Sequence, residues 1–418
     1  MRKNVIIKAL VLGSIGCAFT ITGMAADVVA QDTHSSVNEQ QIHSQDAARH
    51  EAVRSSWMDR TDVVVGVGMK DSKETHTQHH AVGSPPRTDL HTVTSKNSKS
   101  TEINKLYIET LQPITHYDEN AKSVVFVQGR IGRSGEKISS YKLDGYLEPA
   151  RPAGTFIRHD KQTDTKESLG MNANIGIGYR RLSKGEHAYV GVNAFYDHVF
   201  KGGYKRVSGG VEYVAGLNEF HANLYRNLGT DDRKYIGLRG RSNVLGDPAG
   251  LYPYGLDSNQ GLFNYGVVSY ENHWMLSEKV AASGFDVGYS RTFKNARWAR
   301  VYADYYNWRG REAVRVGYYK LKKRDAIKGF KVGAEFHITP HLTLDAGYQT
   351  ASHHLSGPYA TLKYTIGTSK FAWHGGKHSE NAITTARSKM LDKVHRSDMV
   401  VQEVEEETYD HGVVDVGL

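Results

Sequence analysis

The chain has 418 residues, a formal net charge of +8 and a mean hydropathy of -0.52. After residue 26 no window offers the roughly eighteen uncharged apolar residues of a transmembrane helix, which excludes a helical membrane protein. Basic residues are spread along the chain, so the charge does not indicate nucleic-acid binding. The 42 glycines and 25 tyrosines suit β proteins, whether soluble or membrane-embedded.

The first 26 residues have the order of a secretory signal peptide. Three basic residues precede an uncharged apolar run at 9–22, and the small residues Ala25, Ala26 and Ala30 each fit a cleavage site. Cys17 is the only cysteine and its surroundings make a poor lipobox, so we expect a mature chain without thiols. The amino terminus therefore predicts export from the cytoplasm.

Residues 27–120 are polar and rich in Ser, Thr, His, Gln and Lys, with one apolar segment at Val63–Val67. This composition predicts a mostly disordered periplasmic arm, in which the apolar segment forms one short strand or a docking segment. His76, His79 and His80 lack a fixed ligand spacing, so a solvated polar tract is favoured over a metal site.

From Ser123 onward the chain consists of strand-length segments with a period of two. Apolar residues alternate with polar residues and glycine at 171–180, and the pattern recurs at 188–197 and 330–339. Each such strand has one oily face and one polar face. A soluble sandwich shows the same period, so alternation alone does not decide the fold class.

The lengths of the joints between strands favour a barrel. Short joints at 182–186 and 216–217 alternate with long ones at 229–278 and 309–327, as in outer-membrane barrels with tight periplasmic turns and extended surface loops. We therefore predict an all-β fold, a transmembrane antiparallel β-barrel of about twelve strands with both barrel ends in the periplasm. The predicted strands are 123–133, 138–148, 154–163, 168–181, 187–199, 204–215, 218–228, 279–292, 297–308, 328–339, 341–350 and 358–367.

Several motifs occur in a familiar order and spacing between Ser123 and Glu403. They include NANIGIGYRR at 172–181, a long run from Tyr189 to Tyr213, GFDVGYSRTF at 284–293 and VGAEFHITPHLTLDAGYQT at 332–350. In these motifs the chain resembles the β-domain of the inverse autotransporters, the intimin and invasin family.

The resemblance implies a bacterial outer-membrane anchor with a periplasmic arm, a barrel at 121–368 and a linker at 369–403 that threads the lumen. It also implies help from the barrel-assembly machinery and periplasmic chaperones, and a role in adhesion or colonisation. Only a short acidic tail at 404–418 follows the linker, so we expect no folded passenger domain. The alternative function is a passive structural pore or translocator remnant.

Charged and polar residues on the wet face of the strands are candidates for lumen and linker contacts. Opposite charges there can pair across the wall and hold the linker, or they can only solvate the channel. The candidates are Arg180, Asn193, Asp197, Arg206, Glu212, Glu335 and Asp345 on strands and Arg396 in the linker.

The sequence shows no catalytic constellation. Asp197 and His198 are adjacent on a strand and point to opposite faces, so they do not share one lumen water. Gly66 and Gly68 lack the downstream glycine of a phosphate loop. We expect no enzymatic activity, cofactor or metal.

The predicted surface loop at 309–327 is basic. Lys322, Lys323 and Arg324 would face lipopolysaccharide phosphates or anionic host glycans, although a solvated loop is the simpler interpretation. The expected partners are outer-membrane lipid, lipopolysaccharide and a host-cell receptor or glycan. The loop at 229–278 is the other candidate contact surface.

Overall fold

The structure is a computed structural model. It describes residues 56–82, 87–117, 120–150, 155–229, 232–245, 265–310, 314–316, 319–321, 326–352, 356–367, 373–374 and 386–417. Apart from two short 3-10 turns, η2 (Trp57–Arg60) and η4 (Ala386–Lys389), the regular structure of these residues is β-strand. None of them belongs to a helix that is long and apolar enough to cross a membrane.

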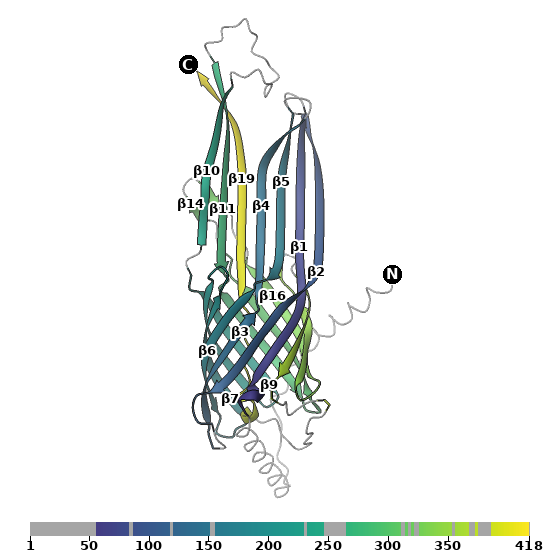
Figure 1. The fold of residues 1–418 in the computed structure, drawn as a ribbon, viewed down its shortest axis with the longest axis vertical. Coiled ribbons are helices and arrows are strands. Elements are labelled where there is room, and N and C mark those ends of the chain that lie inside the picture. The colour runs from purple at the N-terminus through teal and green to yellow at the C-terminus, as the bar shows by residue number, and fades with distance from the viewer. Residues whose placement is uncertain are drawn as a thin grey trace, which may run out of the picture. The chain divides into compact units, whose positions relative to one another are not determined.

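Twelve strands close into an antiparallel barrel, which confirms the predicted fold class (Figure 1). β18 pairs with β1, for example at Leu362 and Val65, and this pairing closes the circle. Closure leaves no free strand edge in the bilayer. In order of pairing the strands are β1 (Thr61–Val82), β2 (Arg87–Pro113), β3 (Ser123–Arg133), β6 (Met171–Leu182), β7 (Ala188–Val199), β8 (Lys205–Ala215), β9 (Asn218–Asn227), β12 (Gly284–Phe293), β13 (Ala296–Trp308), β16 (Ile327–His337), β17 (Leu342–Gln349) and β18 (Gly357–Thr365).

Beyond one end of the barrel the hydrogen-bonded strands continue as an extension (Figure 1). Its pairing order is β2–β1–β5–β4–β19–β11–β10. β1 takes part through its carboxy-terminal half and β2 through its amino-terminal half. We call it the extension sheet. The strands that belong to it alone are β4 (Glu136–Ala150), β5 (Thr155–Ser168), β10 (Asp232–Leu245), β11 (Tyr265–Ala281) and β19 (Val400–Gly417). A separate small hairpin joins β14 (Val314–Val316) to β15 (Tyr319–Leu321).

Ten of the twelve predicted strands lie in the barrel, but those at 138–148 and 154–163 do not. These two are β4 and β5, which pair with each other in the extension sheet. β5 is polar on both faces, so it has no oily face to turn toward lipid. β1 and β2 take the vacated places, and β2 turns Leu106 and Ile108 outward with half of each side chain exposed.

Three stretches outside the twelve predicted strands contain strands. β1 and β2 occupy residues 61–82 and 87–113 of the expected disordered arm, and His76 and His79 lie in β1. β10 and most of β11 fall within the expected loop at 229–278, and β19 includes residues 404–417 of the expected acidic tail. Each becomes a strand because another strand satisfies its backbone groups. The described residues contain no group of three or more side chains placed to hold a metal ion.

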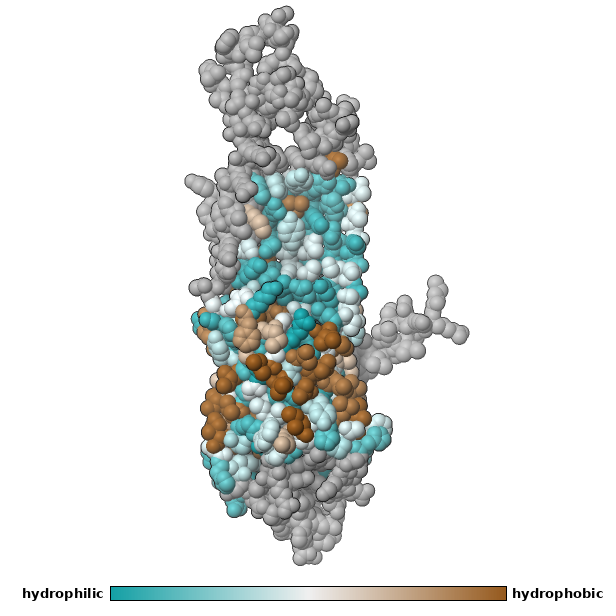
Figure 2. All heavy atoms as spheres, in the orientation of Figure 1, coloured by the Kyte–Doolittle hydropathy of each residue, from teal (hydrophilic) through white to brown (hydrophobic). Residues whose placement is uncertain are grey.

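The outer face of the barrel is apolar. Figure 2 shows hydrophobic residues gathered in a band over the barrel, with hydrophilic residues on the extension sheet. Leu224 is 69% exposed and Ile175 59%, whereas the neighbouring inward residues Asn223 and Asn174 are not exposed. Side chains of this kind gain roughly 1.5–3 kcal/mol each when lipid covers them.

The two barrel ends differ. Turns at 183–187, 216–217 and 294–295 join neighbouring strands at one end, where Gly216 adopts a φ of 58° that a tight turn requires. We call this the short-turn end. The opposite end, from which the extension sheet rises, is the extension end.

Candidate functional site

Residues 386–399 run through the barrel lumen from η4 to β19. Ala386 and Met390 are fully buried and Val394 is 6% exposed. They pack in one hydrophobic cluster with inward residues of the barrel wall such as Phe126 and Tyr189. In the short-turn half of the lumen, linker and wall therefore pack into one hydrophobic core, as in a soluble domain.

Arg180 on β6 is fully buried and joins the wall to the linker. Its guanidinium binds Glu212 on β8 through two hydrogen bonds of 2.5 and 3.0 Å. The remaining nitrogen donates to the main-chain oxygens of Met390 and Asp392, at 2.8 and 2.6 Å. The guanidinium also lies 4.6 Å from the ring centre of Phe126. Its charge is thus neutralised by the wall, and its spare donors hold the linker main chain.

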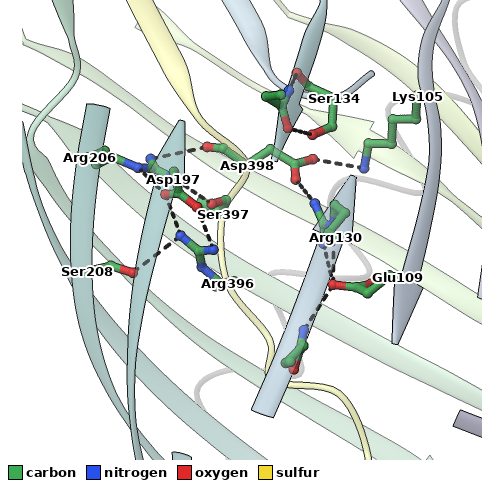
Figure 3. Close-up of polar contacts among 12 residues, drawn as sticks. Lys105, Glu109, Arg130, Ser134, Asp197, Arg206, Ser208, Arg396, Ser397 and Asp398 are labelled. Carbon is green, nitrogen blue, oxygen red and sulfur yellow. Dashed lines mark hydrogen bonds and ion pairs between the residues drawn. The ribbon is translucent and has the colours of Figure 1, made fainter. Parts of the chain in front are cut away.

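A second cluster surrounds Asp197 on β7 (Figure 3). Arg206 from β8 donates to this carboxylate at 2.9 Å, and Arg396 from the linker donates to both of its oxygens at 2.8 and 2.6 Å. Arg206 continues to the main-chain oxygens of Ser397 at 3.0 Å and Asp398 at 3.3 Å. One buried carboxylate therefore ties two strands and the linker together.

Further ion pairs involve linker side chains. Asp398 lies between Arg130 and Lys105, whose ammonium is 3.4 Å away (Figure 3). Lys389 pairs with Glu219 on β9, and Lys393 pairs with Asp62 on β1. These pairs reach wall strands on several sides of the lumen, so they define one register of the linker.

Wall side chains also bind the main chain of the linker, in contacts that do not involve linker side chains. Gln128 on β3 accepts from the Val394 N–H at 2.9 Å, and Asn223 on β9 donates to the His395 oxygen at 3.0 Å. The Tyr225 hydroxyl accepts from the Ser397 N–H at 2.8 Å. Since every residue except proline carries both backbone groups, a polypeptide of almost any sequence can make such contacts in the lumen.

A cavity of about 250 Å³ remains beside the linker. Asp304, Asp345 and Lys331 line it together with the ring of Tyr359, which lies 4.8 Å from the Lys331 ammonium. A polar cavity of this size holds several waters. The linker therefore does not fill the whole lumen.

The structure brings four predicted residues of the barrel wall together with the linker, to which the fifth, Arg396, belongs. Arg180, Glu212, Asp197, Arg206 and Arg396 form the two clusters described above. The main-chain contacts of Gln128, Asn223 and Tyr225 were not predicted, although all three residues fall on the polar side of the two-residue period.

Three predicted residues lie apart from the linker contacts. Glu335 pairs with Arg300 at 2.8 Å in the wall, and Asp345 accepts from the Tyr302 hydroxyl at 2.5 Å. The Asn193 amide is buried, and its nitrogen has no hydrogen-bond partner among the described residues.

Two further predictions concern surface binding and catalysis. Lys322, Lys323 and Arg324 lie outside the described residues. Asp197 points inward to its arginines, whereas His198 lies outward beside the ring of Tyr196, at 6.5 Å between centres. The two side chains therefore cannot activate one water between them.

Comparison with known proteins assigns the chain to a family. The model of the family "inverse autotransporter, beta-domain" matches residues 156–398, more than half of the chain. No curated protein matches the sequence. A chain solved in a study of in-meso crystallization of membrane proteins is 13% identical, with a TM-score of 0.43, and the match covers 83% of this chain and 100% of that chain.

Two autotransporter structures are also similar. The translocator domain of NalP from Neisseria meningitidis is 10% identical with a TM-score of 0.22, and the match covers 81% of this chain and 99% of that one. The β-domain of Brka from Bordetella is 9% identical with a TM-score of 0.21, covering 71% and 99%. On the strength of the family match, which confirms the resemblance of the motifs, this chain belongs to the inverse autotransporter β-domain family and is an outer-membrane β-barrel.

Proposed function

We propose that the barrel anchors and translocates its own carboxy-terminal segment. In this proposal the short-turn end, at which β1 begins, faces the periplasm, and the extension sheet lies outside the cell. The linker enters at the short-turn end, crosses the lumen and continues as β19 at the extension end. Periplasmic chaperones and the barrel-assembly machinery would deliver and insert the chain.

The observation that carries this proposal is the mixture of contacts on the linker. Main-chain contacts from Gln128, Arg180 and Asn223 do not depend on the sequence that occupies the lumen. They suit a wall along which a polypeptide passes. The ion pair of Arg396 with Asp197 depends on sequence, so it holds the chain at its final register.

The exported surface would act in adhesion or colonisation, with a host-cell receptor or glycan as partner. The extension sheet and the basic residues Lys322, Lys323 and Arg324 would present the contact surface. Replacing these three with Ser should weaken binding to host cells or lipopolysaccharide. Unchanged binding would remove this loop from the proposal.

A passive pore is the second candidate function, and the cavity beside the linker favours it. We propose no enzymatic activity, because Asp197, the candidate acid in the lumen, is occupied by two arginines. Conductance across planar bilayers, compared with a variant that lacks residues 382–418, measures how far the linker closes the lumen.

The test of export is a peptide tag placed after Leu418 in intact cells. Antibody should label the tag without permeabilising the outer membrane. A tag that becomes accessible only after permeabilisation would contradict translocation. A tag inserted in the 183–187 turn is the matched control, because it should stay hidden in intact cells.

A further inference from the structure

Four of the exposed cations at the extension end follow one stretch of the barrel rim, from β8 to β16. They are Lys205 at the start of β8, Arg226 near the end of β9, Arg309 directly after β13, and Lys328 near the start of β16. Among the residues that the structure describes, none of the four forms an ion pair. We call them the extension-rim cations.

The strand register places these cations in a row. Lys205 and Arg226 are diagonal neighbours on the paired strands β8 and β9. Arg226 and Arg309 each follow the residue that pairs with Gly284 of β12, so two strand spacings, about 10 Å, separate them. Arg309 and Lys328 are diagonal neighbours across β13 and β16. A single headgroup with several negative charges can therefore reach more than one of them.

The row lies at the border of the apolar band. Leu224 and Leu228 flank Arg226 on the same outward face, with 69% and 52% of their side chains exposed. Phe330, two residues after Lys328, is 55% exposed. A molecule that covers both the cations and these side chains must carry a negative head and an apolar tail.

The described acidic side chains of the barrel strands do not compete for the row. None of the aspartates and glutamates with a described side chain on the twelve barrel strands is exposed. They point inward or pair within the lumen and the sheets, as Glu212 and Glu335 do. Among the described side chains of the barrel strands, the outer surface at the rim is therefore cationic, and it attracts anions within a Debye length of about 8 Å.

We propose that the extension-rim cations bind the phosphates of lipopolysaccharide, while its acyl chains cover Leu224 and Phe330. This inference rests on the proposed orientation, in which the extension end faces outward. The polar extension sheet rises from the same rim. A bulky hydrated sugar head fits beside such a surface better than a small phospholipid head does, so we assign the row to the glycolipid.

The test uses the full-length protein, purified in detergent and stripped of lipid. Binding of purified lipopolysaccharide, dephosphorylated lipopolysaccharide and phosphatidylglycerol is titrated by microscale thermophoresis. The wild type should bind intact lipopolysaccharide at least tenfold more tightly than either other lipid. Replacing all four extension-rim cations with Gln should weaken this binding at least tenfold. Equal affinity for phosphatidylglycerol would overturn the assignment to the glycolipid.

A matched control uses four of the exposed cations at the short-turn end. Replacing Arg181, Lys184, Arg291 and Lys294 with Gln removes the same charge and should change lipopolysaccharide affinity less than twofold. An equal loss in both variants would mean unspecific attraction and would overturn the site. If the fourfold extension-rim variant does not fold, Arg309→Gln alone should still weaken binding at least twofold.

The tag experiment separates this inference from the proposed function. An accessible tag together with unchanged lipopolysaccharide affinity in the extension-rim variant refutes the lipid site alone. A hidden tag refutes the orientation on which both depend.

Discussion

Arg396 of the linker binds both carboxylate oxygens of Asp197 on β7, at 2.8 and 2.6 Å. The same carboxylate accepts from Arg206 at 2.9 Å, so it balances two guanidinium groups whose side chains are 5% and 1% exposed. Because Arg206 also holds the main chain at Ser397, this cluster fixes the linker by charge and by backbone together. Loss of this cluster should therefore destabilise the barrel wall and also release the linker from its position.

Asp197→Ala should destabilise the folded barrel strongly. Two buried guanidinium groups then lose their counter-charge, and breaking a buried pair in this way costs about 3–5 kcal/mol. The measurement is the temperature at which the barrel loses its compact migration in electrophoresis. The double variant Asp197→Ala/Arg396→Met should recover part of the loss, because one unpaired charge is gone. A single variant as stable as the wild type would show that the pair is solvated.

Arg180→Met should loosen the linker and also leave Glu212 buried without its partner. The companion variant Arg180→Met/Glu212→Leu removes that uncompensated charge, so barrel stability should recover while the linker contacts to Met390 and Asp392 stay lost. In planar bilayers both variants should open to the fully conducting state more often than the wild type. The hypothesis fails if the double variant restores the wild-type closed state.

A cysteine pair should lock β19 to β11. Ser277 pairs with Glu405 in the antiparallel register, where partner Cα atoms lie about 4.5–5.5 Å apart, within disulfide range. Ser277→Cys with Glu405→Cys should therefore cross-link under mild oxidation. Ser277→Cys with Glu406→Cys is the control, since residue 406 points to the opposite face. Cross-linking in the control alone would show a register shifted by one residue.

Acid should release β19 from the extension sheet. Burial raises the pKa of Glu407, but hydrogen bonds from Tyr141, Tyr409 and His273 outweigh it and hold the pKa below its ordinary value. The stability from this carboxylate is complete above its unfolded pKa of about 4.3 and is lost as the pH falls through the lower folded pKa. Proteolysis near residue 407 should thus accelerate below about pH 4.

Glu407→Gln provides the control for the acid effect. This variant keeps the shape of the side chain but cannot titrate, so cleavage near residue 407 should change less with pH than in the wild type. A wild type and variant with the same pH profile would assign the acid release to other groups.

Much of the barrel wall follows from the sequence alone. The two-residue period places Arg180, Asp197 and Glu212 on the wet face, and Ile175 on the oily face, because successive strand residues point to opposite sides. The inward position of each charge was therefore predictable. Its partner was not, since the period says nothing about which strand lies alongside.

The tertiary structure decided which strands close the barrel and where the carboxy-terminal segment lies. β1 replaces the predicted strand at 138–148, because Val65 and Val67 can face lipid whereas β4 and β5 are largely polar. β19 is acidic and shows no clear period, yet β4 and β11 flank it. Backbone hydrogen bonds between distant segments stabilise these strands, and such bonds leave no pattern in the side chains.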